Sequence, residues 1–148
     1  MVHENCIQIA YASTATFGDG QIESPQTQRV VFNIVRRSRA NNPGWGVVGA
    51  LYFGDGYFLQ ILEGAEENVD RLFAVIQQDD RHRDLQVLKR EPIAAPQFGR
   101  WSMKFPTMDE DIRGVLGLDL TRGFNPYDFD DARLQKLIGH LLETEEAA

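Results

Sequence analysis

The sequence has little cysteine, a shortage of positive charge and no long apolar run. Cys6 is the single cysteine, so no intramolecular disulfide can form, and CxxC or zinc-ligand spacings are absent. The chain has 15 Lys and Arg residues against 22 Asp and Glu, and its formal net charge of −7 argues against a nucleic-acid partner. No apolar run approaches the roughly 18 residues of a membrane span, and residues 1–5 lack the features of a signal peptide. We therefore expect a soluble, cytoplasmic protein that binds neither nucleic acid nor membrane.

The residues that are present suffice for one domain with a large core, since 43% of the 148 residues are hydrophobic. Apolar periodicity and turn signals predict strands over 6–12, 47–53, 57–64, 85–90 and 100–105, and helices over 24–41 and 65–79. The order βαββαββ predicts an α+β, ferredoxin-like sheet with two helices on one face. After an irregular segment over 106–128, a last helix is expected to cover the other face with Leu134, Leu137, Ile138 and Leu141. We expect residues 106–148 to be an extension of the domain formed by 1–105, not a second domain.

Three short signals set the expected boundaries of the first helix and the hairpin. Ser24 and Pro25 are typical of a helix start, with serine as the N-cap and proline in the first helical position. Pro43 disfavours the helical conformation at Asn42, so we expect the helix to stop there. The Asp55-Gly56 pair predicts a tight turn between the second and third strands.

Gln60 is the unusual residue of the apolar strand over 57–64. Strand residues alternate between faces, so Gln60 shares an inward face with Phe58 and Leu62. A buried amide without partners costs about 1–3 kcal/mol. We therefore expect Gln60 to have hydrogen-bond partners in the core.

The same alternation places other polar or redox-active groups near Gln60. The candidates are Tyr11 in the first strand, Trp101 and Met103 sharing one face of the last strand, and Asn41 and Asn42 at the end of the first helix. If these faces coincide, a phenol, an amide, an indole and a thioether line one cavity beneath the helices. Each is also explained as an ordinary core residue, and an asparagine pair is a common helix cap.

Six blocks of the sequence together resemble the BLUF family, blue-light sensors that use FAD. The resemblance runs in register from about residue 7 to 105, and the Phe-x-Gln-x-Leu-Glu-Gly and Asp-x-Arg-His blocks are specific in combination. The blocks are Tyr11-Ala-Ser13, Arg39-Ala-Asn41-Asn42, Gly46-Val-Val-Gly49-Ala50-Leu51-Tyr52, Phe58-Leu-Gln60-Ile-Leu62-Glu63-Gly64, Asp79-Asp-Arg81-His82 and Phe98-Gly-Arg-Trp101-Ser-Met103.

The resemblance implies a flavin held non-covalently between the two helices of domain 1–105. Tyr11 resembles the photoactive tyrosine, Gln60 the switching glutamine beside it, and Asn42 the asparagine that bonds the polar edge of the flavin ring. Trp101 and Met103 resemble a pair that passes the signal to the last strand. The predicted cofactor-binding residues are Tyr11, Ile34, Ser38, Asn41, Asn42, Gln60, Ile76, Asp79, Arg81 and His82.

The chemistry of these side chains suits those implied roles. Blue light makes a flavin a strong oxidant, a nearby phenol can donate an electron and a proton, and an amide between them can relay the proton. The amide of Gln60 is then left either rotated or tautomerised, with its donor and acceptor ends exchanged, and both possibilities stay open. The expected result is a small red shift of flavin absorption without net redox change.

The acidic residues after the second helix allow two interpretations. Asp79 and Asp80 lie at a helix C-terminus, where the macrodipole disfavours anions by about 0.3–1 kcal/mol. Arg81 and His82 can offset this. Asp79 is either the cap of a solvated turn or the residue that orients Arg81 toward the flavin.

The sequence departs from the family pattern at three places. The interval from Tyr11 to Asn42 is longer than usual through a loop over 17–21, which we expect to bulge outward. Val48 stands where threonine is frequent, and Pro43 after Asn42 is unusual. None of these changes removes the tyrosine, the glutamine or the asparagine.

Three functions compete on these observations. The first is a non-enzymatic photoreceptor that forms homo-oligomers and signals by differential affinity for a downstream protein partner. The second is a flavin-free interaction module, which the inserted loop over 17–21 would favour. The third is a small flavin oxidoreductase, against which the lack of a nicotinamide-binding glycine fingerprint argues.

Overall fold

The computed structural model describes residues 5–17, 25–99, 101, 103–104 and 125–143. Its elements, in chain order, are β1 (Cys6–Ala15), α1 (Pro25–Trp45), β2 (Val47–Gly54), β3 (Tyr57–Ala65), α2 (Glu66–Ile76), β4 (His82–Pro92), the 3-10 turn η1 (Pro126–Asp128) and α4 (Asp131–Glu143).

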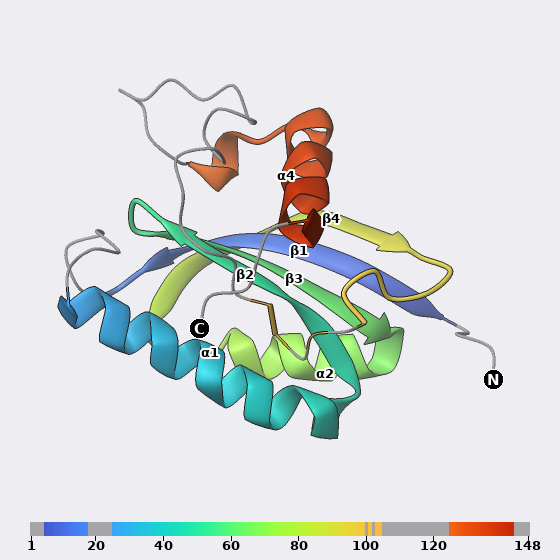
Figure 1. Ribbon diagram of the computed structural model, residues 1–148, viewed down its shortest axis with the longest axis horizontal. Coiled ribbons are helices and arrows are strands. Elements are labelled where there is room, and N and C mark those ends of the chain that lie inside the picture. The colour runs from blue at the N-terminus through green and yellow to red at the C-terminus, as the bar shows by residue number, and fades with distance from the viewer. Residues whose placement is uncertain (1–4, 18–24, 100, 102, 105–124, 144–148) are drawn as a thin grey trace.

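The sheet lies between two layers of helix (Figure 1). Its four strands are antiparallel and ordered β2-β3-β1-β4, with α1 and α2 on one face and α4 on the other. The predicted ferredoxin-like α+β class is thereby confirmed. The predicted fifth strand is described only in part, as a parallel bridge between Lys104 and Ala50 of β2, because residues 100, 102 and 105 lie outside the described residues.

Strand alternation divides the core into two apolar clusters. Phe58 and Leu62 of β3 pack in the cluster beneath α1 and α2, whereas Leu59 and Ile61 pack in the cluster beneath α4. The second cluster also contains the predicted apolar stripe of the last helix, Leu134, Leu137, Ile138 and Leu141. Hence each face of one strand supplies a separate core.

The hairpin between β2 and β3 sets the register of the central strands. Asp55 and Gly56 both have positive φ, 52° and 85°, as a two-residue type I′ turn requires. Pairing then continues onto β1, where Tyr11 stands opposite Gln60. The two residues predicted to react with light are therefore cross-strand neighbours.

The first helix ends later than predicted. α1 continues through Pro43 to Trp45, so the prediction that Pro43 stops it is wrong. Near a helix C-terminus, the missing N–H of proline removes only one intrahelical hydrogen bond. Gly46, with a φ of 70° and its N–H bonded to Pro43 O at 3.1 Å, ends the helix instead. The predicted cap Ser24 lies outside the described residues.

The strands β1 and β4 are also longer than predicted. β1 runs to Ala15, which places Thr14 in the strand and not in a loop, and β4 begins at His82. Asp84 has a φ of 57° and the β1–β4 register shifts nearby, so a bulge lets pairing continue past the expected end. Among the described residues, no helix combines the length and apolar character needed to cross a bilayer.

Candidate functional site: a cleft between α1 and α2

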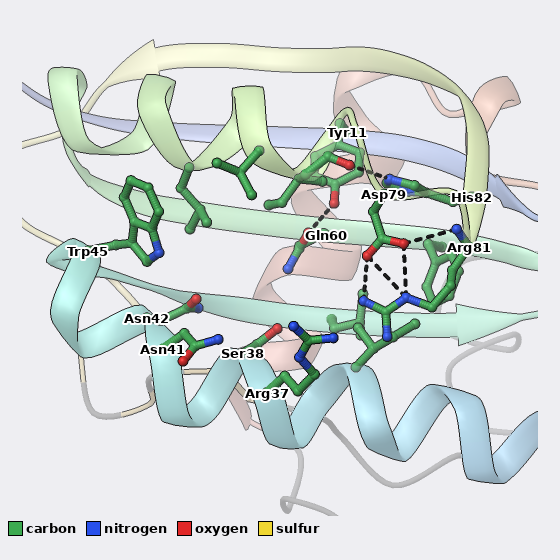
Figure 2. Close-up of a pocket in the computed structure, with 16 residues that line it drawn as sticks. Tyr11, Arg37, Ser38, Asn41, Asn42, Trp45, Gln60, Asp79, Arg81 and His82 are labelled. Carbon is green, nitrogen blue, oxygen red and sulfur yellow. Dashed lines mark hydrogen bonds and ion pairs between the residues drawn. The ribbon is translucent and has the colours of Figure 1, made fainter.

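A cleft opens between α1 and α2 above the centre of the sheet (Figure 2). Its empty volume of ≈ 840 Å³ includes space that is open to solvent. All ten residues predicted to bind a cofactor line it: Tyr11, Ile34, Ser38, Asn41, Asn42, Gln60, Ile76, Asp79, Arg81 and His82. The structure thus brings the ten together, while their contact with FAD stays a prediction.

Tyr11 and Gln60 form the floor of this cleft. Both are buried, with exposed fractions of 2% and 5%, and the Tyr11 hydroxyl donates a hydrogen bond to Gln60 Oε1. Burial raises the pKa of the Tyr11 phenol far above its usual range, and the charge of Asp79 raises it further. The phenol is therefore neutral and acts as the donor of this bond.

The nitrogen end of the Gln60 amide has a weaker partner. Gln60 Nε2 donates to Met103 Sδ at 3.7 Å, and a thioether is a weak acceptor. Figure 2 shows this nitrogen on the side of the cleft where Asn42 and Ser38 lie. The expected partners of Gln60 are thus a phenol and a thioether, with the amide nitrogen facing the cleft.

The first helix lines the opposite wall with one face. Ile34, Ser38, Asn41 and Trp45 follow one another at intervals of three or four residues, which places them in line along α1. Asn42, beside them, is buried at 3% exposed. The alternative that the asparagines cap the helix is wrong, because α1 continues to Trp45.

Asp79 and Arg81 are held together at the end of the cleft. Asp79 Oδ1 accepts from the Arg81 backbone N–H and from Arg81 Nε, both at 2.9 Å, and Arg81 Nη2 contacts Asp79 Oδ2. The hydrogen bonds from Arg81 hold the pKa of Asp79 below its usual range. Asp79 therefore bonds both the turn backbone and the Arg81 guanidinium, while its role in orienting Arg81 toward the flavin stays a prediction.

His82 is fastened to the protein through both ring nitrogens. Nε2 lies 2.8 Å from Ile76 O, and Nδ1 lies 2.8 Å from Ser13 Oγ. A carbonyl only accepts, so Nε2 carries the hydrogen and Nδ1 of the neutral ring accepts from the Ser13 hydroxyl. His82 lines the cleft, but its nitrogens join the end of α2 to β1.

Trp101 and Met103 lie on opposite faces of the sheet, so the prediction that they share one is wrong. Met103 belongs to the cluster beneath α1 and α2, whereas Trp101 packs on the α4 side, 6.1 Å from the Phe98 ring. The cause is the irregular backbone of this segment, which has one bridge to β2 and no continuous ladder among the described residues. Their role as a signalling pair stays a prediction.

The cleft is also lined by six residues that were not predicted from the sequence. They are Arg37, Trp45, Leu51, Phe58, Leu72 and Val75. Helical spacing from Ser38 and Asn41 would have found Trp45, and the hairpin register places Leu51 opposite Gln60. Phe17, at the start of the inserted loop, packs 6.0 Å from the Phe58 ring, and residues 18–21 lie outside the described residues.

A cleft between two helices with a buried phenol–amide pair on its floor defines a small-molecule-binding α+β domain. Residues 6–104 match the family described as sensors of blue-light using FAD. That match covers more than half of the chain, so the protein belongs to the BLUF family, and its cofactor is FAD. The family consists of sensors, which confirms the prediction of a sensor over an enzyme for these residues. The family match supports neither the flavin-free interaction module nor the small flavin oxidoreductase.

Relatives of different lengths share this similarity. The photoactivated adenylate cyclase subunit beta of Euglena gracilis is 37% identical over 76 residues, which are 51% of this chain and 9% of that protein. The blue light- and temperature-regulated antirepressor BluF of Escherichia coli (strain K12) is 28% identical over 129 residues, 85% of this chain and 32% of that protein. This chain therefore spans less than a third of the length of these two relatives.

Two solved structures match along nearly their whole length. The photo-activated state of BlsA has a TM-score of 0.81 at 30% identity, covering 97% of this chain and 99% of that chain. The dark-state structure of BlrB, a BLUF protein, has a TM-score of 0.70 at 27% identity, covering 93% and 98%.

The side chains of the cleft fit FAD. Amides can both donate and accept, as the polar edge of an isoalloxazine ring requires, and Asn41, Asn42 and Gln60 supply three of them. Val75 is 53% exposed although it lines the cleft, so it offers apolar surface that a bound ring can cover. Arg37 and Arg81 bring positive charge to an otherwise acidic protein, which suits a diphosphate.

Proposed function

We propose that Tyr11 and Gln60 are the photoactive pair of this blue-light sensor. The observation that carries this proposal is the buried hydrogen bond from the Tyr11 hydroxyl to Gln60 Oε1, on the floor of the cleft. A buried amide held by a phenol at one end and a weakly accepting sulfur at the other loses only a weak contact when its ends exchange, because a phenol can accept as well as donate. Such a group can record a light-driven event without a large movement.

Several residues would hold the cofactor. Asn41, Asn42 and Gln60 would bond the polar edge of the ring, and Arg37 of α1 and Arg81 of the turn after α2 would meet a diphosphate. The aliphatic side chains that would enclose the ring are Ile34, Leu72, Val75 and Ile76.

FAD, when bound, absorbs blue light and becomes a strong oxidant. Tyr11 is the residue that would give an electron to the light-excited flavin and, with it, lose a proton, and Gln60 Oε1 is the atom that would receive the proton along the existing hydrogen bond. Return of both the electron and the proton to Tyr11 would restore the phenol without net redox change and can leave the amide with its donor and acceptor ends exchanged. Phe73, whose ring lies 5.2 Å from that of Tyr11, helps to keep water from the phenol.

We also propose that the lit state signals by binding another protein. The names of relatives point to such outputs, a photoactivated adenylate cyclase and an antirepressor. A ligand or light can shift binding only through a difference in affinity between two states of the surface. A homo-oligomer and a cytoplasmic location belong to the same proposal, and size measurements in dark and light would test the first.

The photochemical proposal is tested on purified, FAD-loaded protein by absorption before and after illumination. Tyr11→Phe and Gln60→Leu should bind FAD yet lose the reversible red shift completely, because each removes one side of the buried hydrogen bond. Tyr52→Phe and Gln8→Leu are matched controls, since they alter a buried tyrosine and a buried glutamine outside the cleft. A normal shift in either cleft variant would contradict the assignment.

A further inference from the structure

The segment that carries Met103 also reaches the opposite face of the sheet. Lys104 N donates to Gly49 O, and Leu51 N donates to Lys104 O, both at 2.8 Å. These bonds hold the segment beside β2, where Lys104 forms a parallel bridge with Ala50. The Met103 side chain packs in the cluster beneath α1 and α2, and the neighbouring Lys104 side chain contacts α4.

Met103 is bound to two elements of the cleft side. Its sulfur accepts from Gln60 Nε2 at 3.7 Å, and its carbonyl accepts from Arg39 Nε of α1 at 3.0 Å. The side chain is 1% exposed. The position of Met103 thus depends directly on which end of the Gln60 amide faces it.

Lys104 makes the corresponding contacts on the α4 side. It is 1% exposed, unusual for a lysine, and its Nζ donates to Leu142 O at 3.1 Å while lying 4.0 Å from the centre of the Trp101 ring. Leu142 lies in the last turn of α4, where carbonyl groups carry partial negative charge that favours a cation. The lysine therefore joins the segment beside the photoactive pair to the end of α4.

We infer that Lys104 is the positioning residue that passes the state of Gln60 to the last turn of α4, an inference that rests on the proposed function. An amide with its ends exchanged turns Oε1, an acceptor, toward the Met103 sulfur, which also accepts. The contact that seats Met103 is then lost. Because Met103 and Lys104 share a peptide bond, the displacement of one moves the other, and Nζ leaves the Leu142 carbonyl.

The turn η1, which precedes α4, is held by residues of β1, β3 and β4. The Tyr127 hydroxyl of η1 donates to Asp84 O at 2.9 Å and lies 2.9 Å from Thr14 Oγ1. The Tyr57 ring packs against Tyr127 with centroids 5.7 Å apart. None of these contacts involves Met103 or Lys104, so light should loosen the last turn of α4 and leave η1 docked.

The test is hydrogen–deuterium exchange on the FAD-loaded full chain, in the dark and under blue light. In the wild type we expect light to raise amide exchange over residues 139–143 by about tenfold, the effect of losing one hydrogen bond to a charged group, and to change residues 131–134 by less than about twofold. Lys104→Met should show the faster exchange already in the dark, with an unchanged flavin red shift. Lys136→Met, an exposed position on the same helix, is the matched control and should behave as the wild type.

Each outcome decides one question. A wild type with a normal red shift but equal exchange in dark and light overturns the role of Lys104 and leaves the photochemistry intact. A wild type without the red shift overturns the photochemical proposal instead. Lys104→Met with wild-type, light-dependent exchange also overturns the inference. If that variant does not fold, Lys104→Arg, which keeps the charge, replaces it and should retain both the red shift and the light-dependent rise in exchange over residues 139–143. Loss of the red shift in Lys104→Arg would contradict the positioning role.

Discussion

The two faces of the sheet use alternate residues of the same strands, yet one face holds a cleft and the other packs an apolar cluster against α4. On β3, Phe58 and Leu62 lie beneath α1 and α2, and Leu59 and Ile61 lie beneath α4. The two helices on the first side leave the Gln60 amide as the floor of an opening, whereas α4 on the second side packs four leucine and isoleucine side chains into its cluster. The space between α1 and α2 therefore leaves room for a ligand above β3.

Each face also buries one polar residue of β3, and the two are satisfied differently. Gln60 bonds to Tyr11 and Met103 and keeps its nitrogen end toward the cleft. Glu63 is fully buried on the other face, where Oε2 accepts from Gln8 Nε2 and Oε1 accepts from the Phe98 backbone N–H, both at 2.7 Å. The comparison shows that a polar group closed by protein partners builds structure, whereas one left beside an opening can respond to a ligand.

The largest expected effect comes from truncating a leucine on each face. Leu137→Ala beneath α4 and Leu72→Ala beside the cleft should each lower the free energy of unfolding by about 2–5 kcal/mol, because both leave a cavity. FAD at 100 times its Kd should raise the free energy of unfolding of the wild type and of Leu137→Ala by about 2.7 kcal/mol. The increase should be smaller for Leu72→Ala, because Leu72 lines the cleft where FAD would bind. Chemical denaturation with and without FAD measures this, and equal increments in both variants would contradict the comparison.

Glu63→Gln should have the next largest effect. One of the two acceptor oxygens becomes a donor that faces another N–H, so we expect unfolding to become easier by about 1–3 kcal/mol. Glu67→Gln on the exposed side of α2 should change stability by less than about 0.5 kcal/mol. Because Glu63 lies on the closed face, the flavin red shift of Glu63→Gln should be unchanged, and a lost shift would show that the two faces are not independent.

The free energy of unfolding at alkaline pH should reveal the burial of the Tyr11 phenol. Burial raises the folded-state pKa of Tyr11, so its contribution to stability is complete below the unfolded-state pKa of about 10 and is lost as pH rises above it. The free energy of unfolding should fall by about 1.4 kcal/mol per pH unit more steeply in the wild type than in Tyr11→Phe. Parallel curves for the two proteins, measured by denaturation between neutral and strongly alkaline pH, would show that Tyr11 is not buried in solution.

The smallest expected effect is that of Asp79, at the end of the cleft, on stability at acidic pH. Hydrogen bonds from Arg81 lower the folded-state pKa of Asp79, so its stabilising contribution is present above the unfolded-state pKa of about 3.9 and is lost as pH falls through the lowered value. Asp79→Asn should therefore lose less stability than the wild type on acidification. The difference should be small, because the Asp79 side chain is 30% exposed. Acid-unfolding curves of the two proteins provide the measurement.

Periodicity predicted part of the cleft lining, and the resemblance to the BLUF family supplied the rest. The alternation on β3 and the spacing along α1 each depend on local backbone geometry, and local geometry decides which side chains share a face. The ten residues that the resemblance implied line one opening, even though several element boundaries were wrong. The boundary error at Pro43 did not matter, because the helical face of Ser38 and Asn41 is the same whether the helix ends at residue 41 or at Trp45.

Strand alternation does not predict the faces of Trp101 and Met103. Alternation requires a continuous ladder, and between Trp101 and Lys104 the described backbone has one bridge to β2. The indole therefore lies on the α4 face beneath Lys104 Nζ, while Met103 lies beside Gln60. No local pattern reports this reversal, because the pairing with β2 and the contact with α4 produce it.

By itself the sequence determined the alternation of β3, the polar face of α1 and the membership of the BLUF family, since each is a property of residues close together in the chain. Only the tertiary structure decided that Tyr11 meets Gln60, that both nitrogens of His82 are used by the protein and that Lys104 reaches Leu142. The physical reason is distance along the chain. Such contacts join residues brought together by strand register and helix docking, which depend on the packing of the whole core.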